Sequence, residues 1–273
     1  MKHSTNKRVN VGGLWFDAIT QDDLIHDIER HLESSAKQSF CIAKPYVEFF
    51  TQAWQDPKLT IILTEMDRVV ADGVGVQWAA SYLAGKTGFW RWVYSLVVDV
   101  QNKQWREQII PERGAGVDAT KRLLRVASNK GWTVGILGGP RDVGQTQESL
   151  RRLYPKLKLL KVWSGYYDLV DEPHLVDEIR TQHPDILFVA QGFPRQEMFI
   201  NRNKSKSIAK ILIGEGGTFD FDSMGGSLKR APKWLRQIGL EWLWRLILEP
   251  QRWRRQLALP KFIWGIYKLG QQK

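Results

Sequence analysis

An aspartate, Asp72, follows the apolar pair Val69–Val70 and precedes Gly73 and Gly75. β-Branched residues after a polar segment are typical of a short parallel strand, and the residues after the glycines predict a helix. The glycines let backbone approach a ligand closely and leave the first N–H groups of the helix free to bind an anion. Open α/β sheets bind ligands at the carboxyl ends of their strands, so Asp72 is expected where a phosphate-bearing substrate would lie. The alternative is that Asp72 only caps the helix.

Other chemistry-bearing patterns are sparse. The sequence has no G-x-S-x-G, no phosphate-binding G-x-x-x-x-G-K-[ST] and no H-E-x-x-H. Gly138–Gly139 and Gly216–Gly217 are not a full dinucleotide fingerprint. Asp220-Phe221-Asp222 matches the D-x-D that holds a metal against a sugar-nucleotide diphosphate, but it follows a glycine turn, so capping or polar anchoring is the favoured interpretation. The histidines are scattered, so we expect no metal site.

Composition limits the class of protein. The chain has 273 residues, 43% of them hydrophobic, which is enough for a large α/β core. Cys41 is the only cysteine, so an intrachain disulfide is excluded and a reducing compartment is favoured. No apolar run reaches the roughly 18 residues that span a bilayer. The polar start, residues 1–10, lacks the apolar segment of a signal peptide, so we expect a cytoplasmic protein.

Positive charge is concentrated near the end of the chain. The net charge is +11, and residues 229–273 contain eleven Lys or Arg and two Glu, a net charge of +9. Five of the 13 tryptophans lie in the same segment. A basic, Trp-rich segment suits nucleic acid or an anionic membrane surface. Because the segment has no nucleic-acid-binding module, we favour the membrane.

Strands and helices are expected to alternate along much of the chain. The expected strands are 39–43, 69–70, 132–137, 157–162, 185–190 and 208–213, and the expected helices are 21–33, 46–54, 117–129, 143–153, 173–182 and 196–203. This order predicts a Rossmann-like, mostly parallel sheet with helices on both faces. Right-handed crossovers place all strand-to-helix loops at one edge. Asp72, Gly138–Gly139, Gly192 and Gly216–Gly217 should therefore meet in one crevice.

Three segments fall outside this pattern. Residues 8–19 alternate around a Gly-Gly pair and predict a small β-hairpin. The aromatic segment within 85–111 is interpreted as a lid or surface-seeking insertion, or equally as a packed core helix. Residues 233–249 predict a helix ended by Pro250, and 251–269 a last amphipathic segment interrupted at Pro260. We divide the chain into an α/β core, 1–228, with the insertion at about 85–111, and a basic C-terminal appendage, 229–273.

Five blocks of sequence resemble the WecG/TagA/CpsF family, glycosyltransferase family 26. They occur in the family's order and cover roughly residues 9–255. The blocks are Ala71–Val76; Leu137–Pro140; Gly192–Glu197; Gly214–Phe221; and Lys229–Pro232 followed by Gly239–Leu246 and Glu249–Arg252.

The resemblance implies an inverting transfer of an N-acetylhexosamine, of the N-acetylmannosamine type, from a UDP-sugar to a polyprenyl-diphosphate-linked sugar in cell-surface polysaccharide synthesis. It implies no cofactor and no metal. Because the acceptor is lipid-linked, peripheral association with the inner face of the plasma membrane is expected. Homo-oligomerisation is one alternative for the assembly.

The resemblance also assigns roles to residues. Asp72 matches the family's proposed general base, and Arg113 an arginine near the donor diphosphate. Gln196 and Asp220 match residues that line the nucleotide-sugar pocket. Arg245, Arg252 and Arg255 match arginines of a C-terminal appendage that docks at the membrane and completes the site. The remaining residues that we expect to contact substrate are Lys44, Gly73, Gly138, Gly139 and Gly216.

One departure affects the expected site. The family usually has Thr-x-Asn-Pro where this chain has Ile42-Ala43-Lys44-Pro45. Lys44 is expected to pair with a diphosphate or an acidic donor sugar, or to lower the pKa of Asp72 if it lies close. The departure motivates a second hypothesis, a non-catalytic nucleotide-sugar-binding or assembly protein on the same fold. A nucleic-acid-binding protein is a third hypothesis, which rests on charge alone.

Overall fold

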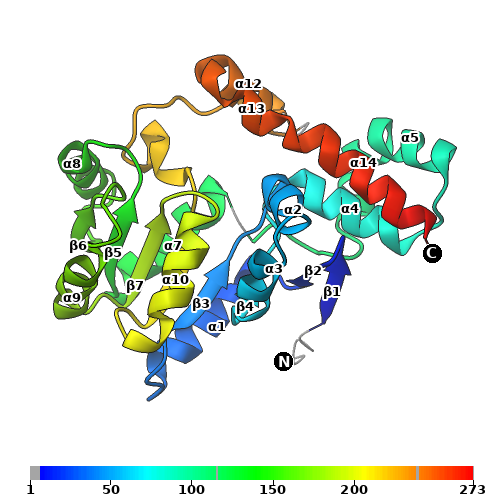
Figure 1. Cartoon of the computed structure of the whole chain (residues 1–273). Coiled ribbons are helices and arrows are strands. Elements are labelled where there is room, and N and C mark those ends of the chain that lie inside the picture. Colours follow the sequence, from blue (N-terminus) through cyan, green and yellow to red (C-terminus); the bar gives the residue numbers. More distant parts are fainter. Residues whose placement is uncertain (1–6, 115, 238–239, 273) are drawn as a thin grey trace.

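The expected alternation of strands and helices is present in the computed structural model, which describes residues 7–114, 116–237 and 240–272 (Figure 1). The strands are β1 (Arg8–Val11), β2 (Leu14–Asp17), β3 (Phe40–Ala43), β4 (Arg68–Val69), β5 (Thr133–Gly138), β6 (Lys158–Trp163), β7 (Ile186–Ala190) and β8 (Ile211–Gly214). The α-helices of the first half are α1 (Gln21–Glu33), α2 (Val47–Ala53), α3 (Pro57–Thr64), α4 (Val74–Ala84), α5 (Phe89–Val97), α6 (Lys103–Arg106) and α7 (Val117–Lys130). Those of the second half are α8 (Val143–Leu153), α9 (Glu172–Gln182), α10 (Arg195–Asn203), α11 (Lys233–Gln237), α12 (Glu241–Leu248), α13 (Trp253–Gln256) and α14 (Ala258–Gln271).

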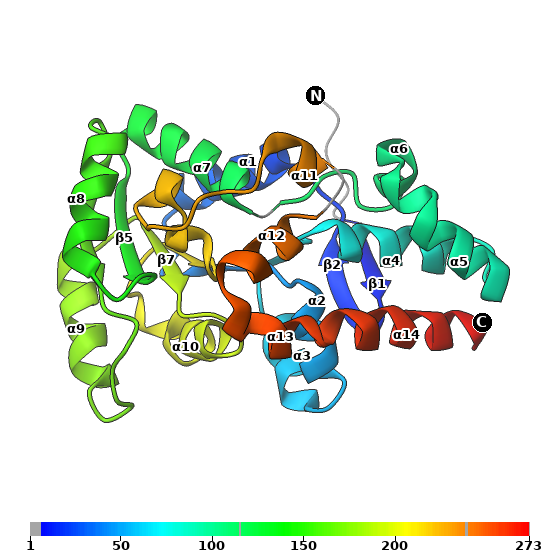
Figure 2. The same ribbon diagram turned by 90° about the horizontal axis from the view of Figure 1, so that it is seen from above.

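The main sheet has six strands in the order β4-β3-β8-β7-β5-β6, and every pairing in it is parallel. β1 and β2 form the predicted antiparallel hairpin. Helices cover both faces of the sheet (Figure 2). Residues of β7 alternate between two buried clusters: Ile186 and Phe188 pack with α1, α7 and α8, and Leu187 and Val189 with α2, α3, α9 and α10. The predicted fold class is confirmed.

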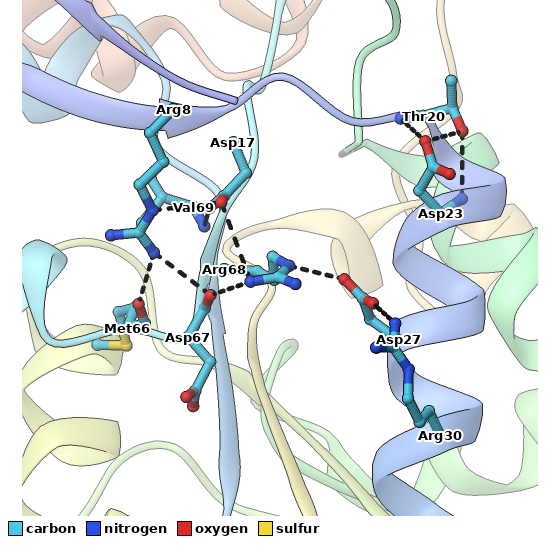
Figure 3. Close-up of polar contacts among 10 residues, drawn as sticks. All are labelled: Arg8, Asp17, Thr20, Asp23, Asp27, Arg30, Met66, Asp67, Arg68 and Val69. Carbon is cyan, nitrogen blue, oxygen red and sulfur yellow. Dashed lines mark hydrogen bonds and ion pairs between the residues drawn. The ribbon is translucent and has the colours of Figure 1, made fainter. Parts of the chain in front are cut away.

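A polar network holds the edge strand β4, which has only two residues (Figure 3). Asp17, from the hairpin, is 1% exposed and accepts a hydrogen bond from the Val69 backbone N–H at 2.8 Å. Arg8 donates to the same carboxylate at 3.3 Å. Arg68 pairs with Asp27 of α1, with Nε 2.7 Å from Oδ2. Side chains thus satisfy backbone hydrogen-bonding groups at this free strand edge. The loop that carries Asp72 therefore begins from a fixed position.

The aromatic segment before residue 111 forms a helix that is packed on one side and exposed on the other. α5 packs one face against α4, where Trp78 Nε1 donates to Ser95 Oγ at 3.0 Å. Its other face is exposed, with Trp90 at 80%. Among the described residues no helix is both long and apolar enough to cross a membrane.

The C-terminal segment differs from its expected boundaries. The predicted helix 233–249 is α11 and α12, and Gly239 of the family-like block lies outside the described residues. Pro250 begins a short 3₁₀ turn, so the helix does not continue to Arg252 and Arg255. Pro260 does not interrupt the last helix, because it falls in the first turn of α14, where proline is tolerated.

α14 is anchored in the core. Phe262 is fully buried. Its ring centroid lies 4.8 Å from that of Phe50 in α2 and 6.2 Å from that of Trp54, the C-cap of α2. Ile266, one turn further on, is also fully buried. The C-terminal helix therefore stabilises the elements on either side of the Lys44 and Asp72 loops, because α2 follows the first loop and α4 the second.

We expect Phe262→Ala to lower the free energy of unfolding by about 3–5 kcal/mol, because the substitution leaves a cavity among buried rings. The matched control is Lys261→Ala on the exposed side of α14, which should change stability by less than about 0.5 kcal/mol. Urea unfolding followed by circular dichroism measures both values. Equal, small effects would show that α14 does not contribute to the core.

Candidate active site

The loops after neighbouring strands bring the predicted residues to one edge of the sheet. Lys44 follows β3, Asp72 follows β4 and Glu215 follows β8, and these three strands are adjacent in the order β4-β3-β8. The Asp72 backbone N–H donates to the carbonyl of Pro45 at 3.1 Å, which ties the first two loops together. The predicted convergence therefore holds for the residues of this edge.

Asp72 does not cap the helix that follows it. The N-cap of α4 is Gly73, with φ 84°, and no side chain caps this end. Within the described part of the chain, the Asp72 carboxylate accepts no side-chain or backbone hydrogen bond. The capping alternative is therefore wrong.

Burial raises the pKa of Asp72 from 3.8 to about 6. The Lys44 ammonium and the Arg113 guanidinium lower this pKa, whereas the carboxylates of Glu215 and Glu241 raise it. The expected effect of Lys44 is thus present, but burial outweighs it and the net shift is upward. A carboxylate that titrates near pH 6 is ionised at neutral pH and is more basic than an ordinary aspartate, as a general base requires.

Lys44 is engaged with a partner inside the protein. Its ammonium pairs with the carboxylate of Glu215, and both residues are 7% exposed. Thr120 of α7 donates its hydroxyl hydrogen to the other oxygen of Glu215. We expected Lys44 to meet a diphosphate or an acidic sugar, whereas the structure pairs its charge with Glu215. Its electrostatic influence on Asp72 is retained.

Gln196 joins two glycine loops. Its Oε1 accepts hydrogen bonds from the backbone N–H of Gly192 at 3.1 Å and of Gly216 at 2.9 Å, and its Nε2 donates to Glu197 at 2.8 Å. The Gln196 side chain is 2% exposed, so its amide is committed to holding the loops after β7 and β8. Gly216 has φ 60°, and a Cβ added to it would meet no atom within 4 Å, so backbone conformation rather than crowding requires glycine there.

Gly138 and Gly139 are explained by packing. A Cβ on Gly138 would lie 2.4 Å from the carbonyl oxygen of Ala190, closer than any side chain can approach. The Gly139 backbone N–H donates to the same carbonyl at 2.9 Å. These glycines allow β5 to end close to β7, so packing accounts for both.

Arg245 links the C-terminal segment to the loop after β8. Its guanidinium pairs with Asp220 and lies 5.1 Å from the ring centroid of Phe221. Its Nε is 2.9 Å from Glu249, which also accepts from Arg252 at 3.1 Å. Asp220 therefore anchors Arg245, in agreement with the polar-anchoring interpretation of the D-x-D sequence. The described residues contain no group of three or more His, Cys, Asp or Glu that could hold a metal.

The two remaining arginines occupy different positions. Arg255 pairs with Glu48 of α2 at 3.0 Å and donates to the Tyr46 hydroxyl at 3.0 Å, beside the loop that carries Lys44. Arg113 is exposed, and its backbone carbonyl accepts from Gln21 Nε2 at 2.9 Å. Its guanidinium lies close enough to lower the pKa of Asp72, so the structure brings these two predicted site residues together.

The predicted set omitted Glu215, which the structure places at the centre of the site. A signal was present, because Glu215 directly follows a buried strand and precedes Gly216–Gly217, as Asp72 precedes its own glycines. Thr120 was also missed, and no sequence pattern marks it, because its contact joins residues 95 positions apart.

The raised pKa of Asp72 predicts a stabilising substitution. The native state binds the Asp72 proton more tightly than the unfolded state, so the free energy of unfolding falls as pH rises from about 4 to about 6. We expect Asp72→Asn to raise it by about 1–3 kcal/mol at pH 8, and by less at pH 4.5. Urea titrations at both pH values measure the difference. A variant that is less stable than wild type at pH 8 would contradict the raised pKa.

The Lys44–Glu215 pair predicts a large cost for breaking one partner. Lys44→Met should lower the free energy of unfolding by about 3–5 kcal/mol, because Glu215 is left buried without its counter-ion. The double substitution Lys44→Met with Glu215→Gln should recover most of this loss. Lys161→Met is the matched control, because Lys161 pairs with Glu178 on the surface and should cost less than about 1 kcal/mol. Equal losses in the two single variants, measured by urea unfolding, would show that the buried pair has no special role.

Comparisons with known proteins show which family the chain is similar to. The family model described as "Glycosyl transferase WecG/TagA/CpsF family" matches residues 9–95 and 102–273. A relative from Bacillus spizizenii is 32% identical over 244 residues, 87% of this chain and 84% of the relative. One from Staphylococcus aureus is 26% identical over 268 residues, 98% of this chain and 95% of the relative. Both relatives are named N-acetylglucosaminyldiphosphoundecaprenol N-acetyl-beta-D-mannosaminyltransferase. The chain belongs to the WecG/TagA/CpsF family of glycosyltransferases.

Proposed function

We propose that this glycosyltransferase moves an N-acetylmannosaminyl group from a UDP-sugar to a polyprenyl-diphosphate-linked N-acetylglucosamine, with inversion at the anomeric carbon. The observation that carries the proposal is the Asp72 carboxylate at the carboxyl edge of the sheet. It does not cap a helix, and its pKa is about 6. The sugar and the acceptor class are supported by the printed names of the relatives. The product would be a lipid-linked intermediate of a cell-surface polysaccharide.

In the proposed reaction, an acceptor hydroxyl attacks the anomeric carbon of the donor on the face opposite the diphosphate. The new carbon–oxygen bond forms while the bond from the anomeric carbon to the diphosphate oxygen breaks, and UDP departs with the electron pair. Asp72 takes the hydroxyl proton as the attack proceeds. The Asp72 carboxylate accepts no hydrogen bond among the described residues, which supports its availability for this step.

The departing diphosphate needs positive charge. We assign this role to Arg113, which lies near Asp72, and to Arg245, Arg252 and Arg255 of the C-terminal segment. Arg245 already reaches the loop after β8, where its Nη1 is 3.4 Å from the carbonyl oxygen of Gly217. We propose that these arginines, without a metal or other cofactor, neutralise the leaving group. Turnover that persists in EDTA would support this assignment.

A lipid-linked acceptor would confine the reaction to a membrane surface. The proposal therefore includes peripheral association with the inner face of the plasma membrane, supported by the net charge of +9 in residues 229–273. Homo-oligomerisation stays a prediction, and analytical sedimentation would test it.

The second candidate is a nucleotide-sugar-binding protein without turnover. The specific observation in its favour is the Lys44–Glu215 pair, which fills with a salt bridge a position where the family usually has asparagine. Calorimetry with UDP-sugars separates the two candidates, because binding without product formation by any UDP-N-acetylhexosamine favours the second.

We expect Asp72→Asn to lower kcat by about 10²–10⁴-fold with little change in KM, because the amide cannot accept the proton. The matched control is Asp222→Asn, an exposed aspartate from the same D-x-D sequence as Asp220, which should keep wild-type activity. The assay follows UDP release from UDP-N-acetylmannosamine in detergent with a polyprenyl-diphosphate-N-acetylglucosamine acceptor. A fully active Asp72→Asn variant would remove Asp72 as the base.

A further inference from the structure

α5 presents an apolar face that no other described element covers. Trp90, Tyr94 and Val97 are 80%, 53% and 60% exposed, and their spacing of four and three residues puts them on one side of the helix. Val98, directly after the helix, is 45% exposed and extends the same face. Single exposed apolar residues are common, but a continuous row on one helix marks an interaction surface. We call these four residues the α5 face.

The opposite side of α5 is firmly held, so the α5 face is not the result of an undocked helix. Ser95 is fully buried and accepts a hydrogen bond from Trp78 of α4. The Trp92 ring centroid lies 5.0 Å from that of Tyr267 and 6.2 Å from that of Trp264, both on α14. α5 and α14 lie side by side in both views of the molecule (Figures 1 and 2).

Positive charge lies beside the α5 face, on α14. On the neighbouring α14, Lys261, Trp264 and Lys268 are exposed and share one side of the helix. Residues 250–272 contain five Lys or Arg and no Asp or Glu. The acidic residue next to the α5 face, Asp99, is paired with Arg91. An apolar, Trp- and Tyr-rich face with a cationic border complements an anionic lipid surface, because these rings prefer the boundary between headgroups and hydrocarbon.

We propose that the α5 face inserts into the headgroup region of an anionic bilayer, with the exposed side of α14 lying against the lipid phosphates. This inference rests on the proposed function, because it names the surface through which an enzyme with a lipid-linked acceptor meets its membrane. The site and the surface are connected by α4, which begins directly after Gly73 and ends shortly before α5. α4 is buried along most of its length and is about 16 Å long. Insertion of α5 would therefore hold the Asp72 loop at a fixed position relative to the bilayer.

The direct test compares two double variants. Trp90→Ser with Tyr94→Ser removes the rings of the α5 face, and Leu169→Ser with Val170→Ser removes two residues of similar exposure from the turn before α9, at the other end of the molecule (Figure 1). Vesicles of phosphatidylcholine and phosphatidylglycerol in a 4:1 ratio are the probe, and flotation measures partitioning. We expect the first pair to lower the partition coefficient at least about tenfold, and the second to change it less than about twofold.

A second measurement does not depend on the stability of the double variant. Cys41 is 1% exposed, so Trp90→Cys allows an environment-sensitive dye to be attached at position 90 alone. The dye emission should shift to the blue on addition of the anionic vesicles, and should not shift with phosphatidylcholine alone. An unchanged spectrum with anionic vesicles would overturn the proposal.

The outcomes also separate this inference from the proposed function. With a water-soluble, short-chain acceptor, Trp90→Ser with Tyr94→Ser should keep wild-type turnover while losing activity on vesicle-bound acceptor. A wild-type enzyme that turns over but does not bind vesicles overturns the membrane surface and leaves the reaction standing. Vesicle binding through position 90 without turnover overturns the proposed reaction and leaves the membrane surface standing. If sedimentation shows that the substitutions dissociate an oligomer and leave vesicle binding unchanged, the α5 face contacts a second copy and the proposal is wrong.

Discussion

Two carboxylates and one ammonium lie just beyond the ends of three adjacent parallel strands. The rest of the site depends on which of the two carboxylates pairs with the ammonium. Lys44 pairs with Glu215, whose other oxygen accepts from Thr120, so this pair is internally satisfied. Asp72 is desolvated by burial, lies near a second carboxylate and has no hydrogen-bond donor of its own among the described residues. Its pKa is raised because burial outweighs the lowering effect of the Lys44 ammonium, and the Glu215 carboxylate adds to the rise.

The surrounding elements keep this arrangement in place. The network around Asp17 and Arg68 holds β4, which is too short to be fixed by its two backbone pairings alone. Gln196 joins the loops after β7 and β8. α14 packs on α2 and α4, the two helices that begin just beyond the loops carrying Lys44 and Asp72. The C-terminal segment therefore contributes to the site twice, once by this packing and once through Arg245 on the loop after β8.

Much of the fold could be predicted because its signals are local. The capping box at Thr20 and Asp23 fixes the start of α1, and the buried β-branched runs mark the strands. The convergence of Asp72 with the glycine loops follows from the handedness of parallel crossovers. The partner of Lys44 could not be read from the sequence, because residues 44 and 215 are joined only by the pairing of β3 with β8. The sign of the Asp72 pKa shift was likewise hidden, since it depends on burial, which exceeds the effect of the nearest cation.

Proline was the least reliable guide. Pro250 ends α12 as expected, but Pro260 is the third residue of α14 and lies in its first turn, where proline is tolerated. The aromatic segment before residue 111 is interpreted from the sequence as a surface segment or as a packed helix. These interpretations do not exclude each other, because α5 buries one side and exposes the other. An amphipathic helix shows its period in the sequence, but which side meets protein depends on neighbours such as α14 that are distant along the chain.

The pH dependence of kcat/KM with a water-soluble acceptor tests the central claim most directly, because it reports the pKa of the essential base in the free enzyme. The account predicts that kcat/KM rises with pH as one group loses its proton, with a midpoint near 6, and that this limb is absent from the residual activity of Asp72→Asn. A midpoint near 4, or a profile in the variant with the same limb as wild type, would contradict it.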